Sequence, residues 1–209
     1  MTTLDRIVRI GRLRLPGQLQ GPTSSRGLVI FAHGSGSSRL SPRNQFVAHC
    51  LHQRGISTLL FDLLQETEAV DRRRVFDIAL LASRLGDALD WQMQQPDLSR
   101  MPTGLFGAST GAAAALVAAS DRPSLKAIVS RGGRPDLAHD ALARVEVPTL
   151  LIVGEFDDDV LALNRKAAEQ MHCVREIAVV PGATHLFGEP GTLETAAQLA
   201  SDWFTKYLL

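Results

Sequence analysis

The stretch that decides the fold is GLFGASTGAAAALVAAS, residues 104–120. A short apolar run leads to Ser109, which stands between Gly107 and Gly111, and an alanine-rich segment follows without a break. The apolar run predicts a buried strand, and alanine at nearly every position predicts a helix packed closely on a sheet. The pattern G-x-S-x-G between a strand and a helix is that of a nucleophile elbow, which presents a serine hydroxyl at the end of a sheet.

The two glycines have a physical reason in such a turn. Side chains at Gly107 and Gly111 would collide with the strand and with the departing helix. The N–H of Thr110 would stand at a helix N-terminus, where unpaired donors and the helix dipole favour a negative oxygen. A G-x-S-x-G also arises by chance in chains of this length, so the strand-to-helix context carries much of the prediction.

The rest of the chain alternates between strand-like and helix-like segments. Residues 6–20 alternate apolar and polar side chains and break at Gly11 and Pro16, which predicts an antiparallel hairpin at a sheet edge. We therefore predict a three-layer α/β fold with about eight mostly parallel strands and helices on both faces. Further strands are expected at 28–33, 56–62, 103–106, 125–130, 147–154 and 175–182. Helices are expected near 42–54, 71–95, 110–120, 135–143, 159–171 and 192–207.

Length and composition favour one domain over residues 1–209. With 45% hydrophobic residues, the chain can bury a single large core. The 22 basic and 22 acidic residues balance, so no charge signal for nucleic acid or an anionic membrane is present. No apolar segment reaches the roughly 20 residues of a membrane span, and the first residues lack a signal peptide's apolar block, so a cytoplasmic location is expected.

The sequence gives no reason to expect a metal or a cofactor. Cys50 and Cys173 are far apart and lack the spacing of zinc or redox motifs, so both are expected to be reduced and structural. The histidines likewise show no metal-ligand spacing. The expected partner is a small molecule, and the oligomeric state is left open.

An acid and a histidine follow Ser109 in the places that a catalytic triad requires. Asp157 follows the apolar run TLLIVG, and His185 follows the run REIAVV. Because the carboxyl ends of parallel strands meet at one edge of the sheet, these side chains should converge on Ser109. In such a triad the histidine removes the serine proton, and the aspartate orients the imidazole.

Other candidates for the acid and the base are present. Asp158 and Asp159 adjoin Asp157, and we expect them to cap the following helix. Asp136 is a further candidate acid, because it follows the preceding strand. His33 could be mistaken for a base, although a role in shaping its loop is favoured.

Four motifs together, HGSGSS, GASTG, GEFDDDV and GATHLF, resemble those of the α/β-hydrolase superfamily, close to its small lidless members of the dienelactone hydrolase type. The resemblance extends from about residue 5 to 207. It implies the triad Ser109, Asp157 and His185, with the N–H groups of Ser35 and Thr110 as oxyanion hole. Dienelactone hydrolases carry a cysteine nucleophile, so Ser109 departs from them and argues against dienelactone as substrate.

A cluster of arginines stands outside this minimal site. Arg131 and Arg134 lie in SRGGRPD, residues 130–136, at the carboxyl end of a predicted strand. Guanidinium groups there would suit a carboxylate or a phosphate on the substrate. The alternative is that they are solvated and paired with the nearby Asp136 and Asp140. Two further arginines, Arg39 and Arg43, follow the predicted oxyanion loop and could face the same cleft.

The function predicted from these residues is that of a serine hydrolase. It would cleave a small ester, a lactone or a related acyl compound, with an anionic substrate as one option, through an acyl-enzyme intermediate. Two alternatives remain at this stage: a non-catalytic small-molecule binding protein on the same fold, and a serine peptidase.

Overall fold

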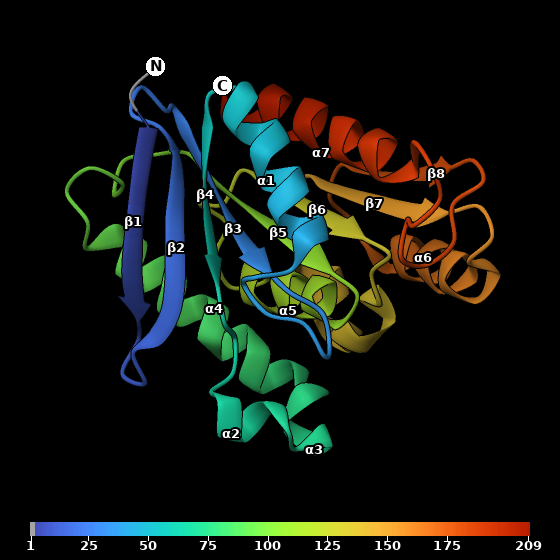
Figure 1. Cartoon of the computed structure of the whole chain (residues 1–209). Coiled ribbons are helices and arrows are strands. Elements are labelled where there is room, and N and C mark those ends of the chain that lie inside the picture. The colour runs from blue at the N-terminus through green and yellow to red at the C-terminus, as the bar shows by residue number, and fades with distance from the viewer. Residues whose placement is uncertain (1–2) are drawn as a thin grey trace.

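The fold is built on one eight-stranded sheet with the strand order β1-β2-β4-β3-β5-β6-β7-β8. The computed structural model describes residues 3–209, and Figure 1 shows the sheet between two layers of helices. The strands are β1 (Thr3–Ile10), β2 (Leu15–Pro22), β3 (Gly27–Ala32), β4 (Ile56–Phe61), β5 (Thr103–Ala108), β6 (Ala127–Arg131), β7 (Thr149–Gly154) and β8 (Arg175–Val180). The helices are α1 (Pro42–Gln53), α2 (Glu66–Ala69), α3 (Arg72–Val75), α4 (Ile78–Met93), α5 (Thr110–Ala119), α6 (Asp158–Gln170) and α7 (Thr192–Leu208), with a 3₁₀ segment η1 (Pro135–Arg144).

The pairing of the strands confirms the predicted sheet. Strands β1 and β2 form an antiparallel hairpin at one edge, and β2 also pairs antiparallel with β4. All pairings from β4 through β3, β5, β6 and β7 to β8 are parallel. The carboxyl ends of β3, β5, β6, β7 and β8 therefore meet at one edge of the sheet, as the sequence predicted.

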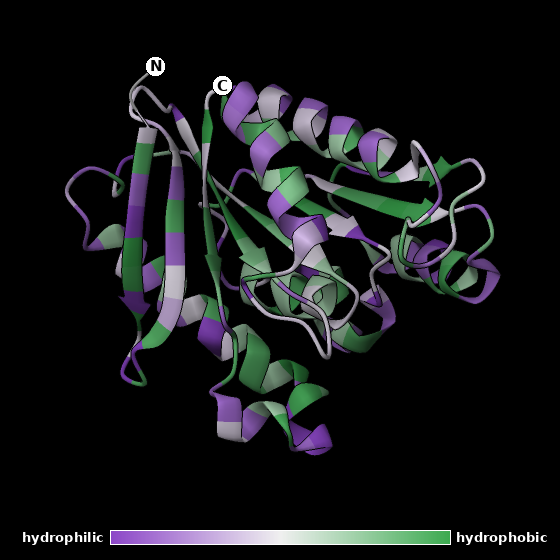
Figure 2. Cartoon of the chain, viewed as in Figure 1, coloured by the Kyte–Doolittle hydropathy of each residue, from purple (hydrophilic) through white to green (hydrophobic). Residues whose placement is uncertain are grey.

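The sheet separates two hydrophobic cores, because successive side chains of a strand point to opposite faces. In β3, Leu28 and Ile30 pack into the core under α4 and α5, whereas Val29 and Phe31 pack into the core under α1 and α7. Figure 2 agrees with this division: the central strands are mostly hydrophobic, and hydrophilic residues lie on α1 and α7. Because β3 is buried on both faces, its sequence is apolar without interruption.

The prediction of one long helix over residues 71–95 was wrong. The chain forms two helices there, α3 and α4, and Figure 1 shows α3, together with the preceding α2, projecting below the sheet. The reason is capping: the Asp71 carboxylate accepts from the N–H of Arg73, and the Asp77 carboxylate accepts from the N–H of Leu80. An aspartate that caps begins a new helix. The short helix expected near 135–143 is the 3₁₀ segment η1, broken at His139 with φ 45°.

The turn between β5 and α5 has no room for side chains at the two elbow glycines. A Cβ at Gly107 would overlap the backbone of Ala112, and a Cβ at Gly111 would overlap the carbonyl oxygens of Ala32 and His33. All of these are backbone atoms of packed elements, so they cannot rotate away. Helix α5 can thus start directly against β3 only because both positions are glycine.

Gly111→Ala should destabilise the fold. Displacing α5 or the end of β3 should cost about 1–3 kcal/mol, as overpacking does in other cores, or roughly 2–12 °C in melting temperature for a chain of this size. Gly86→Ala is the matched control, because Gly86 lies inside α4 and its Cβ would meet only the Arg122 guanidinium at 3.6 Å. That change should raise the melting temperature, since alanine favours a helix over glycine by about 1 kcal/mol. Equal melting temperatures for the two variants would contradict the steric argument.

Candidate active site

Ser109 stands at the sharp turn between β5 and α5 with a strained backbone. Its φ and ψ are 51° and −121°, a conformation that side-chain-bearing residues rarely adopt. The turn is held by its neighbours: the Ser109 N–H donates to the Arg131 carbonyl at 3.3 Å, and the Ser109 carbonyl accepts from the N–H of Arg134 at 3.1 Å. The half-buried side chain lines a cavity of about 220 Å³ at the carboxyl edge of the sheet.

His185 lines the same cavity and forms a pair with Asp157. The His185 Nδ1 lies 2.6 Å from the Asp157 Oδ2, and the side chains are 38% and 13% exposed. A carboxylate oxygen only accepts, so Nδ1 carries the hydrogen and Nε2 is left as an acceptor. A general base needs this tautomer, because the free Nε2 can take a proton from a hydroxyl group.

Of the aspartates weighed from the sequence, only Asp157 contacts His185 through a hydrogen bond among the described residues. Asp157 itself occupies the N-cap position of α6, and Asp158 and Asp159 lie in the first turn. The prediction that these two cap the helix was therefore wrong, although a carboxylate in the first turn is favoured by the helix dipole. Asp136 forms an ion pair with Arg134 at 2.8 Å.

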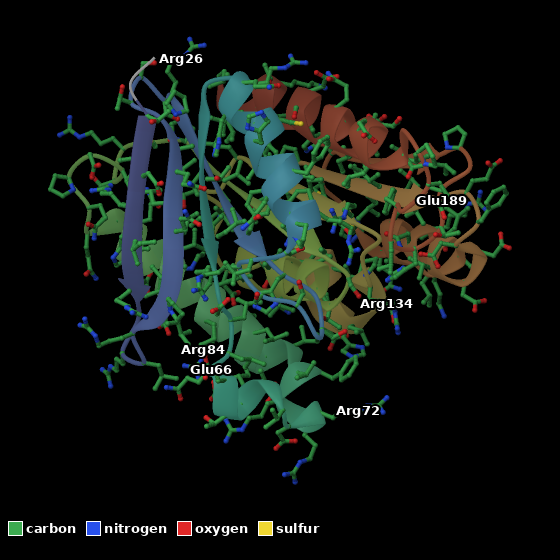
Figure 3. The ribbon with its side chains drawn as sticks, in the orientation of Figure 1. Arg26, Glu66, Arg72, Arg84, Arg134 and Glu189 are labelled. Atoms are coloured by element: carbon green, nitrogen blue, oxygen red, sulfur yellow. The ribbon has the colours of Figure 1, made fainter. Side chains whose placement is uncertain are left out.

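The loop that carries His185 is fastened by two carboxylates. Glu189 accepts from the Thr184 N–H at 3.1 Å and from its hydroxyl at 2.6 Å, and these hydrogen bonds lower the pKa of the Glu189 carboxyl. Glu155 accepts from the Gly182 N–H at 2.8 Å. Figure 3 shows Glu189 on the loop beyond β8. Both acids hold the segment immediately before His185, and these contacts help to keep its imidazole in place relative to Asp157.

The residues of the two predicted oxyanion donors, Ser35 and Thr110, border a common cavity. Thr110 is the first residue of α5, so its N–H has no acceptor within that helix. Ser35 belongs to the loop after β3, and both residues line one cavity of about 290 Å³. The loop can come this close because Gly34 has no side chain: a Cβ there would lie 3.0 Å from the Ser109 Cβ. The placement suits two N–H donors for one oxygen.

His33 fixes the oxyanion loop. Its Nε2 accepts from the Leu63 N–H at 3.0 Å, which leaves Nδ1–H to donate to the Gly34 carbonyl at 3.0 Å. Burial lowers the pKa of this imidazole, so the neutral form is favoured. Both ring nitrogens are thereby occupied, one by the loop itself and one by the segment after β4, which agrees with the expectation that His33 shapes the loop. On the same side, the Asp62 carboxylate accepts from the backbone and the guanidinium of Arg39.

The four arginines considered in the sequence analysis fall into two groups: two line the cavity of Ser109, and two form ion pairs with aspartates. Arg131 is 7% exposed and lines the cavity with Ser109 and His185, as does the half-buried Arg43. Arg134 forms its ion pair with Asp136 and does not line that cavity, and Figure 3 shows it at the periphery of the molecule. Arg39 is paired with Asp62. Arg131 and Arg43 therefore lie where the sequence analysis expected them. The expectation that Arg134 faces the cleft was wrong, and Arg134 and Arg39 each pair with an aspartate.

Three supporting residues were missed by the sequence analysis: Asn44, Glu189 and Asp62. Asn44 lies buried in the first turn of α1, and its Oδ1 accepts from Arg131 across a separation of 87 residues. No local pattern predicts such a contact. Asp62 follows directly on β4, at the carboxyl edge of the sheet, and that position was a usable signal.

The described residues contain neither a candidate metal centre nor a candidate membrane span. Residues 3–209 contain no group of three or more histidine, cysteine or acidic side chains arranged to hold a metal ion. Over the same residues, no helix has the length and apolar character to cross a bilayer. Cys50 and Cys173 are both free thiols, and burial raises the pKa of each.

These features define a protein of the α/β-hydrolase class. They are the elbow serine after β5, the aspartate after β7 with the histidine after β8, and the glycine-rich loop after β3. The chain belongs to the α/β-hydrolase family, whose domain matches residues 25–202. A solved dienelactone hydrolase from Anabaena variabilis is 52% identical, with a TM-score of 0.94 over 100% of this chain and 99% of that one. The chain is therefore a dienelactone hydrolase-like member, as its motifs predicted.

Two further relatives extend the comparison. Est1E from Butyrivibrio proteoclasticus shares the fold, with a TM-score of 0.81 and 15% identity over 97% of this chain and 98% of that one. A protein from Mycobacterium tuberculosis that is named as a phosphoribosyl transferase is 57% identical over 199 residues. This match covers 95% of the present chain but 45% of the relative, so the chain spans about half the length of that protein.

Proposed function

We propose that the protein is a serine hydrolase that cleaves small esters, lactones or related acyl compounds through an acyl-enzyme intermediate. One observation carries the proposal: Ser109 lines a cavity together with His185, whose Nδ1 is held by Asp157 at 2.6 Å. A binding protein on this fold has no need of a strained elbow serine, a histidine in the base tautomer and a half-buried carboxylate bonded to that histidine.

In the proposed first step, the Ser109 Oγ bonds to the substrate's carbonyl carbon while the His185 Nε2 takes the hydroxyl proton. The carbonyl oxygen becomes an oxyanion and accepts hydrogen bonds from the N–H groups of Ser35 and Thr110. The bond to the leaving group then breaks, and His185 returns the proton to the departing atom. Water attacks the acyl-enzyme in the same manner, releases the acid and restores Ser109.

The name of the Mycobacterium relative does not change this proposal. The present chain matches less than half of that protein, and the matched part is the hydrolase-like domain. We infer that the transferase name refers to the remaining part of the relative. A serine peptidase stays the second candidate, because the same triad would also cleave an amide.

Labelling with a fluorophosphonate probe tests the proposal. An activated Ser109 should displace fluoride from the probe's phosphorus, and peptide mass spectrometry should place the adduct on Ser109. Ser109→Ala should abolish labelling, whereas Ser37→Ala, a change of the same kind in the same cavity, should retain it. A folded wild-type protein without any adduct would favour the non-catalytic binding protein. Turnover of anilides at the rate of matched esters would favour the peptidase.

A further inference from the structure

Two cavities of different character meet at the oxyanion loop. The larger, about 290 Å³, has a wall of apolar side chains from the segment after β4, from α3 and from α4, namely Leu63, Leu64, Val75 and Leu81. Its polar side chains include the acids Asp62 and Glu66, and Figure 3 shows Glu66 on α2. The smaller, about 220 Å³, contains Arg43 and Arg131, and no acid is among its described lining residues. The residues Gly34, Ser35 and Ser37 border both.

Arg131 is a buried cation without an acidic partner in the described part of the chain. Its Nη2 donates to the Asn44 Oδ1 at 3.2 Å, its Nη1 is buried without a hydrogen-bond partner, and its guanidinium lies 5.7 Å from the Phe106 ring centroid. Burial, with Arg43 nearby, lowers the pKa of Arg131 to about 10, so the group stays charged at neutral pH. An uncompensated buried charge is costly, and an anion in the adjoining cavity would offset that cost.

Arg43 adds a second positive charge to the same cavity. It is half-buried at the start of α1, and no ion pair or hydrogen bond of its guanidinium is found among residues 3–209. The contrast with the neighbouring arginines is informative, because Arg39 and Arg134 each have an aspartate. Two guanidinium groups beside one cavity, both without an acidic partner among residues 3–209, suit a carboxylate or a phosphate.

His185 decides which part of the substrate occupies the cationic cavity. The imidazole must hand its proton to the leaving atom, so the leaving group lies on the side of His185. His185 lines the cavity of Arg43 and Arg131 and is absent from the lining of the apolar cavity. The acyl chain then points past the oxyanion donors into the apolar cavity, where Glu66 would repel an acyl carboxylate.

We infer that the natural substrate pairs an apolar acyl group with a leaving group that bears a carboxylate or a phosphate, bound by Arg43 and Arg131. The inference rests on the proposed serine hydrolase activity and adds the substrate class. It places the negative charge on the alcohol half of the ester, and not on the acyl half.

Four aryl esters test the inference. The neutral reference is phenyl butyrate, and 3-carboxyphenyl butyrate and 3-(butyryloxy)phenyl phosphate carry the anion on the leaving group. Monophenyl glutarate carries it on the acyl chain. We expect kcat/KM for at least one leaving-group anion to exceed that of phenyl butyrate by roughly tenfold to a hundredfold, the effect of one charge-assisted contact. Whichever of the two anions is preferred identifies carboxylate or phosphate. Monophenyl glutarate should be the poorest of the four.

Variants of Arg43 and Arg131 test whether these two side chains cause the preference for an anionic leaving group. Arg43→Gln and Arg131→Met should each reduce the ratio of kcat/KM between the preferred anionic ester and phenyl butyrate to near one. Arg43 is half-buried at the surface, so its variant keeps the test valid if Arg131→Met fails to fold. Arg134→Gln is the matched control and should leave the ratio as in the wild type.

The outcomes separate the inference from the proposed function. If none of the four esters is cleaved, the serine hydrolase assignment itself fails. If all are cleaved but monophenyl glutarate is preferred, or no anion is preferred, the subsite assignment is overturned while the hydrolase activity stands. An unchanged ratio in Arg43→Gln also overturns it.

Discussion

Ser109→Ala is expected to lower kcat/KM for p-nitrophenyl acetate by about four to six orders of magnitude. Removing the nucleophile of a serine hydrolase costs up to about 10⁶ in rate, and the oxyanion hole alone supports only a small residual reaction. Continuous release of p-nitrophenol measures the loss, with the uncatalysed hydrolysis subtracted. Without the serine hydroxyl the variant cannot form an acyl-enzyme, so it should also lose any initial burst of p-nitrophenol.

The fold should tolerate this change. The Ser109 side chain makes no hydrogen bond within the described residues, and the backbone at φ 51° is held by bonds to Arg131 and Arg134. Alanine at a positive φ is strained much as serine is. A melting temperature within a few degrees of the wild type would show that lost activity reflects lost chemistry. Near-normal turnover by a folded Ser109→Ala protein would end the assignment.

Most strands of the sheet could be predicted from the sequence because each is marked by a pattern within its own residues. Unbroken apolar runs predicted β3 to β7, and the alternation over residues 6–20 predicted the hairpin of β1 and β2. Where local signals conflicted, the prediction failed. Residues 71–95 have helical character throughout, but Asp71 and Asp77 cap new helices, and the segment bends to form a wall of the apolar cavity.

The candidate site was predictable to the extent that topology determines it. Parallel strands bring Ser109, Asp157 and His185 to one edge, so strand ends and polar residues indicated this region. The choice of Asp157 over Asp158 and Asp159 rested on the resemblance to the family. Partners of individual side chains were not predictable. Arg131 and Arg134 are three residues apart in the same motif, yet one is buried against Asn44 and the other is paired with Asp136. That difference depends on where α1 packs, which no pattern around residue 131 contains.

Asp157→Asn is expected to lower kcat by about 10⁴. The Asp157 Oδ2 accepts from the His185 Nδ1 at 2.6 Å and thereby keeps Nε2 free to take a proton. An asparagine amide that donates to Nδ1 would move the hydrogen to Nε2, which then cannot act as the base; the corresponding change in a serine protease has an effect of this size. Turnover of p-nitrophenyl acetate measures it, alongside a melting curve. Asp157 makes no side-chain capping bond to α6, so little stability should be lost.

Asp158→Asn and Asp159→Asn are the matched controls, because they make the same change at the next two positions. Both carboxylates lie in the first turn of α6, where their interaction with the helix dipole is worth about 0.3–1 kcal/mol. Each should therefore lower stability slightly and change turnover by less than tenfold. A larger loss of activity in either control than in Asp157→Asn would move the acid of the triad to that position, and it would contradict the pairing with His185 on which the proposed mechanism depends.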